Sequence, residues 1–268
     1  MAEASGEQFE ALVRIMERLR ADGGCPWDRE QTRQSLKPFL IEEAYEVVEA
    51  IDEGDTEQLL EELGDLLFQV VFHAQVAAER GEFTIGQVLA ATADKMVRRH
   101  PHVFSDGTAS TAGEVLEQWE KLKREERDAV AAVPGSALDG VPKELPALLR
   151  AQRLQDKASR AGFDWPEISG VIAKVEEELD ELRVAVQAAA PNEIELELGD
   201  LLFSLVNMAR FLNLSAEDAL RRSIGRFSAR FRYMEQAVEG GGRRLKEASP
   251  EEMNSLWEEA KAWRLPLA

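Results

Sequence analysis

A seven-residue run, Glu-Leu-Gly-Asp-Leu-Leu-Phe, occurs twice in this chain of 268 residues, at 62–68 and at 197–203. An acidic cluster of the form Glu-Glu-x-x-Glu precedes each copy, at 42–46 and at 177–181. The runs and the clusters are separated by the same distance, since 197 − 62 and 177 − 42 both equal 135. A constant separation over several carboxylates indicates a duplicated unit whose acidic residues share one task.

Each run predicts a helix with its acidic residues on one face. The segment 62–78 is apolar nearly all round, and a helix of this kind is usually buried. An ionised carboxylate in such a helix is costly unless it is paired or bound to a metal. On a 3.6-residue period the two acids of each run share a face with Gln69 and His73 in the first copy and with Ser204 and Asn207 in the second.

The upstream acidic clusters predict a second helix in each half, antiparallel to the first. A short break, at 53–55 or 190–192, separates the two helices, so their acidic faces can meet. Four carboxylates would then converge, and an all-oxygen ligand set is typical of Mg²⁺, with Mn²⁺ as a possible substitute. The alternative is a solvated acidic face with a structural aspartate. The predicted ligands are Glu43, Glu46, Glu62 and Asp65, and in the second half Glu178, Glu181, Glu197 and Asp200.

Helix signals continue through both halves, and no segment keeps the alternation typical of strands. The stretch 129–146 has several Ala, Gly and Pro residues and the weakest helical pattern. We therefore predict an all-α protein of two tandem antiparallel four-helix-bundle-type domains, 1–130 and 147–268, joined by a linker at 131–146. Capping sequences predict the starts of further helices after Thr84, Thr111, Ser215 and Ser249.

Composition excludes several classes of protein. The net charge of −19 argues against stable binding to nucleic acids or anionic membranes, which requires a basic patch. Cys25 is the single cysteine, so it cannot form an internal disulfide, and this fits a reducing cytoplasm. No apolar run approaches the ~18 residues of a membrane span. We expect a cytoplasmic protein that does not enter a membrane.

Basic and aromatic residues recur downstream of the carboxylates in both halves. Each half has a pair of cations at i, i+4 on one helix face and a Trp-x-x-x-Lys sequence. On an acidic chain such groups suit polyphosphate oxygens, and the alternatives are ordinary surface cations and core tryptophans. The residues are Lys95, Arg99, Trp119 and Lys123, and in the second half Arg226, Arg230, Trp257 and Lys261.

Four features together resemble the MazG family of nucleoside triphosphate pyrophosphohydrolases over nearly the whole chain: the Gly-Cys-Pro-Trp-Asp turn at 24–28, the acidic clusters, the paired runs, and Arg-His-Pro-His-Val-Phe at 99–104. The resemblance implies tandem MazG-like domains, a homodimer, and Mg²⁺-dependent hydrolysis of NTPs and dNTPs to the monophosphate and pyrophosphate. It also implies the housecleaning of aberrant nucleotides. Carried over, Glu178, Glu181, Glu197 and Asp200 match the metal ligands, and Arg226, Arg230, Trp257 and Lys261 match the substrate contacts. Arg226 is a departure, because the family commonly has Lys there.

From these residues we expect water to attack the α–β phosphate linkage. Glu177 or Glu178 is the expected acceptor of the proton of the water, and the cations of the second half, Arg226, Arg230 and Lys261, would neutralise the developing charge. We expect both halves to bind metal and the C-terminal half to carry most of the catalysis. Asn207 can contact a sugar or water, whereas the first half has apolar Phe72 at that place. Two alternatives remain open: a helical adaptor whose acidic faces bind protein partners, and a chain with one catalytic and one structural half.

Overall fold

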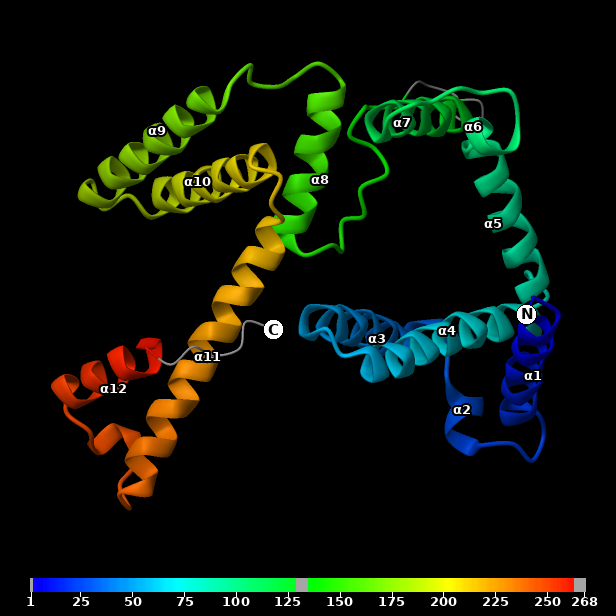
Figure 1. Cartoon of the computed structure of the whole chain (residues 1–268), viewed down its shortest axis with the longest axis horizontal. Helices are drawn as coiled ribbons and strands as arrows, with labels where there is room; N and C mark the ends of the chain where they lie inside the picture. The colour runs from blue at the N-terminus through cyan, green and yellow to red at the C-terminus, as the bar shows by residue number, and fades with distance from the viewer. Residues whose placement is uncertain (1, 129–134, 263–268) are drawn as a thin grey trace. The chain divides into compact units, whose positions relative to one another are not determined.

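The computed structural model describes residues 2–128 and 135–262, and over those residues its regular structure is entirely helical (Figure 1). The all-α fold predicted from the sequence is therefore confirmed. None of the described helices is both long and apolar enough to cross a membrane. In chain order the helices are α1 (Ala2–Arg20), α2 (Pro26–Glu30), α3 (Arg33–Glu53), α4 (Thr56–Glu79), α5 (Ile85–Arg99), α6 (Pro101–Phe104), α7 (Ala112–Asp128), α8 (Ala147–Arg160), α9 (Ile168–Gln187), α10 (Pro191–Phe211), α11 (Ala216–Gly240), the 3-10 helix η1 (Leu245–Glu247) and α12 (Pro250–Ala262).

The chain divides into two compact units within α7, between Leu122 and Lys123. The predicted linker at 131–146 lies partly outside the described residues, and 135–146 form turns without a regular helix. The domain limits of 1–130 and 147–268 remain a prediction. In each unit a long helix pair, α3 with α4 or α9 with α10, forms the centre. Helices α1 and α5 pack on α4 in the first unit, and α8 and α11 pack on α10 in the second.

The turns inside the two helix pairs have different local chemistry. Gly54 ends α3 with φ at 71°, a left-handed conformation that glycine adopts without strain. Asp55 then caps α4, because its carboxylate accepts hydrogen bonds from the N–H groups of Glu57 and Gln58 at 2.9 and 3.0 Å. In the second unit Ala190 occupies the capping position without a side-chain hydrogen bond. The break predicted at 190–192 lies at 188–190 instead, because proline is well tolerated in a first helical turn and α10 begins at Pro191.

The predicted capping sequences do cap their helices. Thr84 and Gln87 form a reciprocal capping box at the start of α5, with bonds of 2.9 and 3.4 Å. The hydroxyls that cap α7, α11 and α12 each accept one backbone N–H three residues ahead, and they belong to Thr111, Ser215 and Ser249. Helix α5 ends at Arg99 and a new short helix starts at Pro101, so His100 marks a helix stop.

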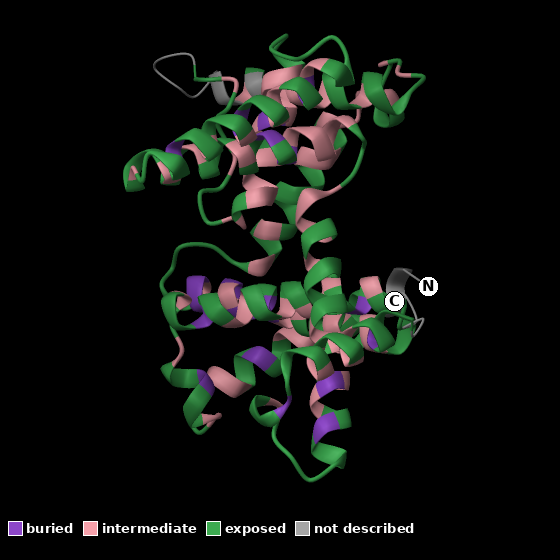
Figure 2. Cartoon of the chain, turned by 90° about the vertical axis from the view of Figure 1, so that its left-hand side faces the viewer, coloured by how far each residue is buried: buried purple, intermediate pink, exposed green. Residues whose placement is uncertain are grey.

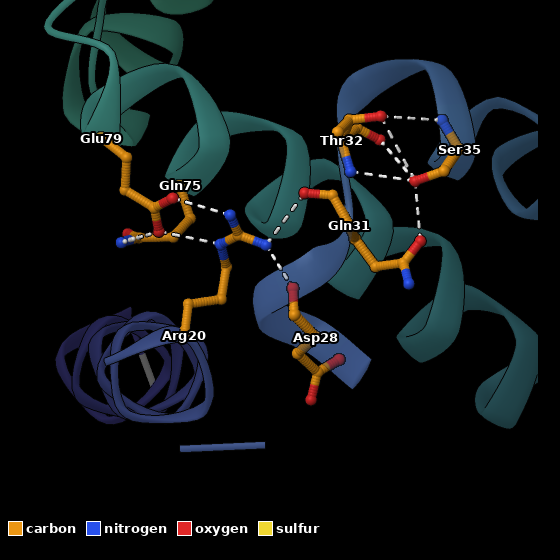
Figure 3. Close-up of polar contacts among 7 residues, drawn as sticks. All are labelled: Arg20, Asp28, Gln31, Thr32, Ser35, Gln75 and Glu79. Carbon is orange, nitrogen blue, oxygen red and sulfur yellow. Dashed lines mark hydrogen bonds and ion pairs between the residues drawn. The ribbon is translucent and has the colours of Figure 1, made fainter. Parts of the chain in front are cut away.

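An apolar core and one arginine hold the first unit together. The core consists of buried Met16, Leu36, Val71, Phe72 and Val76. At its edge the guanidinium of Arg20 donates to both carboxylate oxygens of Glu79, at 2.8 and 2.7 Å (Figure 3). It also donates to the backbone carbonyls of Asp28, in α2, and Gln31, just after α2, so one side chain connects α1, α2 and α4.

The prediction that the helix over 62–78 is buried is wrong for its first half. Leu60, Leu63 and Leu67 on α4 are exposed, and so is Asp65 itself. Exposed Leu198 and Leu202 repeat this pattern on α10. Buried positions occupy only short stretches of the helices, and most of the ribbon is exposed or half-buried (Figure 2). The reason is that α3 or α9 covers only one side of its partner, and no other described element covers the opposite apolar side.

Candidate metal and nucleotide site

Three carboxylates meet on each helix pair. On α3 and α4 one oxygen each from Glu43, Glu62 and Asp65 lie within 4.8 Å of one another. On α9 and α10 the same is true of Glu178, Glu197 and Asp200. The turns between the helices are short, so each pair is antiparallel and its acids face one another across the contact. The structure thus brings together six of the eight predicted ligands.

The other two predicted ligands, Glu46 and Glu181, lie beside these clusters. Burial raises the pKa of Glu46, and the charges of Glu62 and Glu42 raise it further. Burial likewise raises the pKa of Glu197, and the negative charges of Glu181, Glu178 and Asp200 raise it further. A group of carboxylates that raise one another's pKa is under mutual repulsion, and a bound cation relieves it.

In the first cluster a carboxyl pKa is also raised, and the neighbouring hydrogen-bond donor is the neutral amide of Gln69. Burial raises the pKa of Glu43, and the charge of Asp65 raises it further. The side-chain amide of Gln69 donates to Glu43 at 3.5 Å, a weak bond. His73, predicted on the same face, has a buried Nε2 that lacks a hydrogen-bond partner among the described residues. The first cluster therefore offers oxygen donors, and among the described residues no ion pair to a cation is seen at Glu43, Glu62 or Asp65.

The second cluster has a cation that the sequence interpretation missed. The ammonium of Lys174 donates to Glu178 at 2.6 Å and to Glu177 at 3.0 Å. These hydrogen bonds raise the pKa of Lys174 well above its usual range. Glu178 is only 4% exposed, and Glu177 stands exposed at the rim. The signal was present in the sequence, because Lys174 precedes Glu178 by four residues and so faces it on one helix.

A cavity of about 630 Å³ adjoins this second cluster. It lies among α8, the segment 163–165, α9 and α10. Lys174 and Asn207 line it, so the residue predicted to contact a sugar or water does face a cavity. Arg210 donates from Nε to the side-chain oxygen of Asn207 at 3.0 Å and pairs with Asp164 at 3.0 and 2.5 Å. Although burial raises the pKa of Asp164, its hydrogen bonds from Arg210 and Ser159 bring it below the usual value.

The predicted substrate contacts of the second half form a separate group on α11 and α12. The guanidinium of Arg230 lies 5.7 Å from the ring centre of Trp257, which also packs on Phe227 at 5.5 Å. Lys261 donates to Glu258 at 2.6 Å, and Arg226 is exposed. Within the described residues, no hydrogen bond or ion pair joins this group to the clustered carboxylates. Helix α11 leads away from α10, with α12 beside its far part (Figure 1).

The corresponding residues of the first half lie on α5 and α7. Lys95 and Arg99 are half-buried in the last turns of α5. The ring of Trp119 packs edge-on against His100 at 5.3 Å, and its indole N–H is buried without a hydrogen-bond partner in the described part of the chain. Lys123 lies beyond the division between the two units.

A duplicated all-α fold with one carboxylate cluster on each helix pair defines a class of helical proteins suited to hard cations. Within that class, the chain belongs to the MazG nucleotide pyrophosphohydrolase family. The model of the MazG nucleotide pyrophosphohydrolase domain matches residues 31–104 and 167–233, which include both clusters.

Relatives of known name extend the similarity over nearly the whole chain. The nucleoside triphosphate pyrophosphohydrolase/pyrophosphatase MazG of Thermotoga maritima is 49% identical over 257 residues, which are 96% of this chain and 97% of the relative. The nucleoside triphosphate pyrophosphohydrolase of Escherichia coli K12 is 45% identical over 263 residues, or 97% and 99% of the two chains. An uncharacterized Bacillus subtilis protein, YabN, is 46% identical over 95% of this chain and 52% of its own length.

Proposed function

We propose that this protein is a nucleoside triphosphate pyrophosphohydrolase that releases pyrophosphate and the nucleoside monophosphate. The observation that carries the proposal is the cluster of Glu178, Glu197 and Asp200, whose oxygens lie within 4.8 Å of one another beside a cavity of about 630 Å³. Membership of the MazG family and the names of the Thermotoga and Escherichia relatives support the same reaction.

The carboxylate clusters fit Mg²⁺, because every donor is a hard oxygen and the acids repel one another without a cation. In the second half Glu178, Glu181, Glu197 and Asp200 would hold the ion, and their first-half equivalents would hold another. Mg²⁺, or Mn²⁺ in its place, would polarise phosphoryl oxygens and lower the pKa of the attacking water.

The side chains around the second cluster supply the remaining chemistry. Glu177 is exposed beside the cluster, and its carboxylate forms an ion pair with Lys174. It is therefore our candidate for taking the proton of the water. With a cation held by Glu178, the ammonium of Lys174 would be available to contact a phosphate. Arg226, Arg230 and Lys261 would neutralise the charge that develops on the leaving pyrophosphate, and Trp257 positions Arg230.

A homodimer accounts for two features of the single chain. The apolar outer sides of α4 and α10 are exposed, and such contiguous patches are typical of protein interfaces. Within the described residues, Arg226, Arg230 and Lys261 make no hydrogen bond or ion pair with the clustered carboxylates of their own chain. A second copy packed on the exposed side of α9 and α10 would cover the leucines and bring its Arg226 and Arg230 to the carboxylates.

We infer that the C-terminal half carries most of the turnover. Its cation pair lies in the middle of α11, whereas Lys95 and Arg99 are in the last turns of α5, and the backbone of a helix frays at its ends. Positioning of charge dominates catalysis of phosphoryl transfer, so this difference matters. A role in nucleotide-pool housecleaning and a cytoplasmic location remain predictions.

Product analysis tests the proposal. The full chain is incubated with each NTP and dNTP, with Mg²⁺ or with EDTA, and the products are separated by ion-exchange chromatography. We expect monophosphate and pyrophosphate with Mg²⁺ and no products in EDTA. Nucleoside diphosphate and orthophosphate as first products would contradict the proposed reaction. Absence of turnover with every nucleotide would instead favour an adaptor whose acidic faces bind protein partners.

A further inference from the structure

Helix α12 carries two of the proposed substrate contacts, Trp257 and Lys261, but little apolar surface holds it in place. It packs on α11, beside the part of that helix far from α10 (Figure 1). Ala260 is buried at 2% exposed, whereas Met253, Leu256 and the tryptophan are only half-buried. A helix of 13 residues is marginal in water by itself, so α12 depends on its contacts with α11.

A bidentate ion pair spans the connection between the two helices. The guanidinium of Arg243 donates from Nη1 to one carboxylate oxygen of Glu252 at 3.1 Å and from Nη2 to the other. Two parallel bonds of this kind fix orientation as well as distance. The same hydrogen bonds raise the pKa of Arg243 and lower the pKa of Glu252. The pair is therefore held by charge and by geometry together.

Each partner of this pair is fixed to its own helix. Gly242 has a left-handed φ of 74° just after α11, and the N–H of Arg243 reaches back to the carbonyl of Val238 at 3.4 Å. Glu252 lies in the first turn of α12, where its N–H donates to the capping hydroxyl of Ser249 at 3.2 Å. The ion pair thus couples the end of one helix to the start of the next.

A second polar contact joins the two helices further along α12. The hydroxyl of Tyr233 on α11 donates to the carboxylate of Glu259, and this hydrogen bond raises the pKa of the tyrosine. Glu252 precedes Trp257 by five residues, and Glu259 follows it by two. The polar contacts therefore flank the tryptophan and fix its place along α11.

The group between these contacts is arranged to receive an anion. The ring of Trp257 packs on Phe227 and lies 5.7 Å from the guanidinium of Arg230. The Nε of Arg230 is buried and has no hydrogen-bond partner in the described part of the chain. Lys261 follows Trp257 by four residues, so the two share a face of α12. A buried N–H without an acceptor indicates a ligand that accepts, such as a phosphate oxygen.

Resting on the proposed function, we propose that Arg243 and Glu252 are positioning residues whose ion pair fixes α12 on α11. With α12 fixed, Trp257 and Lys261 stay beside Arg230, where the phosphates of the substrate bind. Arg243 and Glu252 act through the helix and need no contact with the substrate themselves.

The adjacent arginine provides a matched control. Arg244 donates to the carboxylate of Glu247 at 3.1 and 2.9 Å, so it has the same chemistry one residue further along the chain. This pair lies within the turn of η1 and does not reach α12. Loss of Arg244 should therefore leave the position of α12 unchanged.

Hydrogen–deuterium exchange of the full chain without nucleotide tests the attachment of α12. In Arg243→Met and in Glu252→Gln the amides of α12 are expected to exchange roughly threefold faster or more, because α12 opens more easily. The double variant should exchange no faster than Arg243→Met, since the pair is already lost there. Arg244→Met should match the wild type. Unchanged exchange in both single variants, or additive effects in the double variant, would overturn the proposal.

Steady-state kinetics on one dNTP test the consequence for the reaction. Both single variants are expected to lose roughly fivefold or more in kcat with KM within about twofold, because a misplaced α12 weakens charge stabilisation during the reaction. Arg243→Lys keeps the charge and should recover part of the loss, and Arg244→Met should lose nothing. A pair that served stability alone would lower the free energy of unfolding and leave kcat unchanged, and that result would overturn the positioning role.

The two levels of inference fail separately. If α12 exchanges faster in the variants but the wild type hydrolyses no nucleotide, the attachment by Arg243 and Glu252 stands and the proposed reaction falls. If the wild type hydrolyses NTPs and both variants keep its kcat, the reaction stands and the positioning role falls.

Discussion

At the scale of single residues, charge in this protein is arranged in two opposite ways. Arg20 stabilises Glu79 as an anion, and its hydrogen bond lowers the pKa of that carboxyl. The clustered acids of the two helix pairs face one another instead, and the pKa values of Glu43, Glu46 and Glu197 are raised. The first arrangement stabilises the folded chain directly, and the second becomes favourable only when a cation binds.

The Arg20–Glu79 pair predicts how stability depends on pH. A carboxyl with a lowered pKa in the folded state stabilises above its ordinary value, ~4.3, and this contribution disappears as pH falls through the lower folded pKa. We therefore expect wild-type protein to exceed Glu79→Gln in free energy of unfolding by a constant amount above about pH 5. The difference should shrink at more acid pH. Urea titrations at several pH values measure it, with Glu61→Gln, exposed on the same helix, as the control.

A matched pair of aspartate substitutions distinguishes the two clusters. Asp200→Asn should reduce kcat/KM by on the order of 100-fold or more, because metal-held charge stabilisation is worth several kcal/mol. Asp65→Asn should have a much smaller effect if the C-terminal half carries most of the turnover, since the described cavity adjoins the cluster of Asp200. Steady-state kinetics on one dNTP compare the two. A larger loss for Asp65→Asn would mean that the N-terminal half is the catalytic one.

At the scale of helices, the turns of the two central pairs predict how a capping aspartate changes the free energy of unfolding. Asp55 caps α4 with two hydrogen bonds, and Ala190 caps α10 with none. Asp55→Ala should cost about 1 kcal/mol in free energy of unfolding, and Ala190→Asp should gain a similar amount. Chemical denaturation in EDTA measures both, because it removes contributions of bound metal. If Ala190→Asp destabilises, the N–H groups at the start of α10 are not available to a capping side chain.

At the scale of the whole molecule, the exposed apolar sides of α4 and α10 and the separated cation group predict a site shared between two copies. Asp200→Asn and Arg230→Met should each be nearly inactive alone. In co-expressed heterodimers, one of the two sites would combine an intact Asp200 with an intact Arg230. If subunits pair at random, about half of the dimers are heterodimers, and each of these has one intact site out of two. Co-expression should therefore restore about a quarter of wild-type activity. Asp200→Asn paired with Glu197→Gln, both in one cluster, should restore none. Failure of the first pair to regain activity in verified heterodimers would place Arg230 in the same chain as its carboxylates.

The sequence by itself determined the features that depend on local periodicity. The all-α fold, the duplicated helix pairs and the capped starts at Thr84 and Ser215 follow from spacings within a few turns of a helix. The same spacings placed Asp65 and Asp200 with their glutamates, because residues three or four apart share a helix face.

Only the tertiary structure decided which apolar residues are buried and which polar residues meet. Leu63 and Phe72 are both apolar on α4, yet the first is exposed and the second is 1% exposed, since burial depends on which helices pack on each side. The cavity depends on α8, α9 and α10 together, and no helical period connects Gln155 with Lys174 and Asn207. The two halves keep the same acids at one offset, but the cavity beside the second cluster could not be read from that offset, because its walls come from side chains on three separate helices.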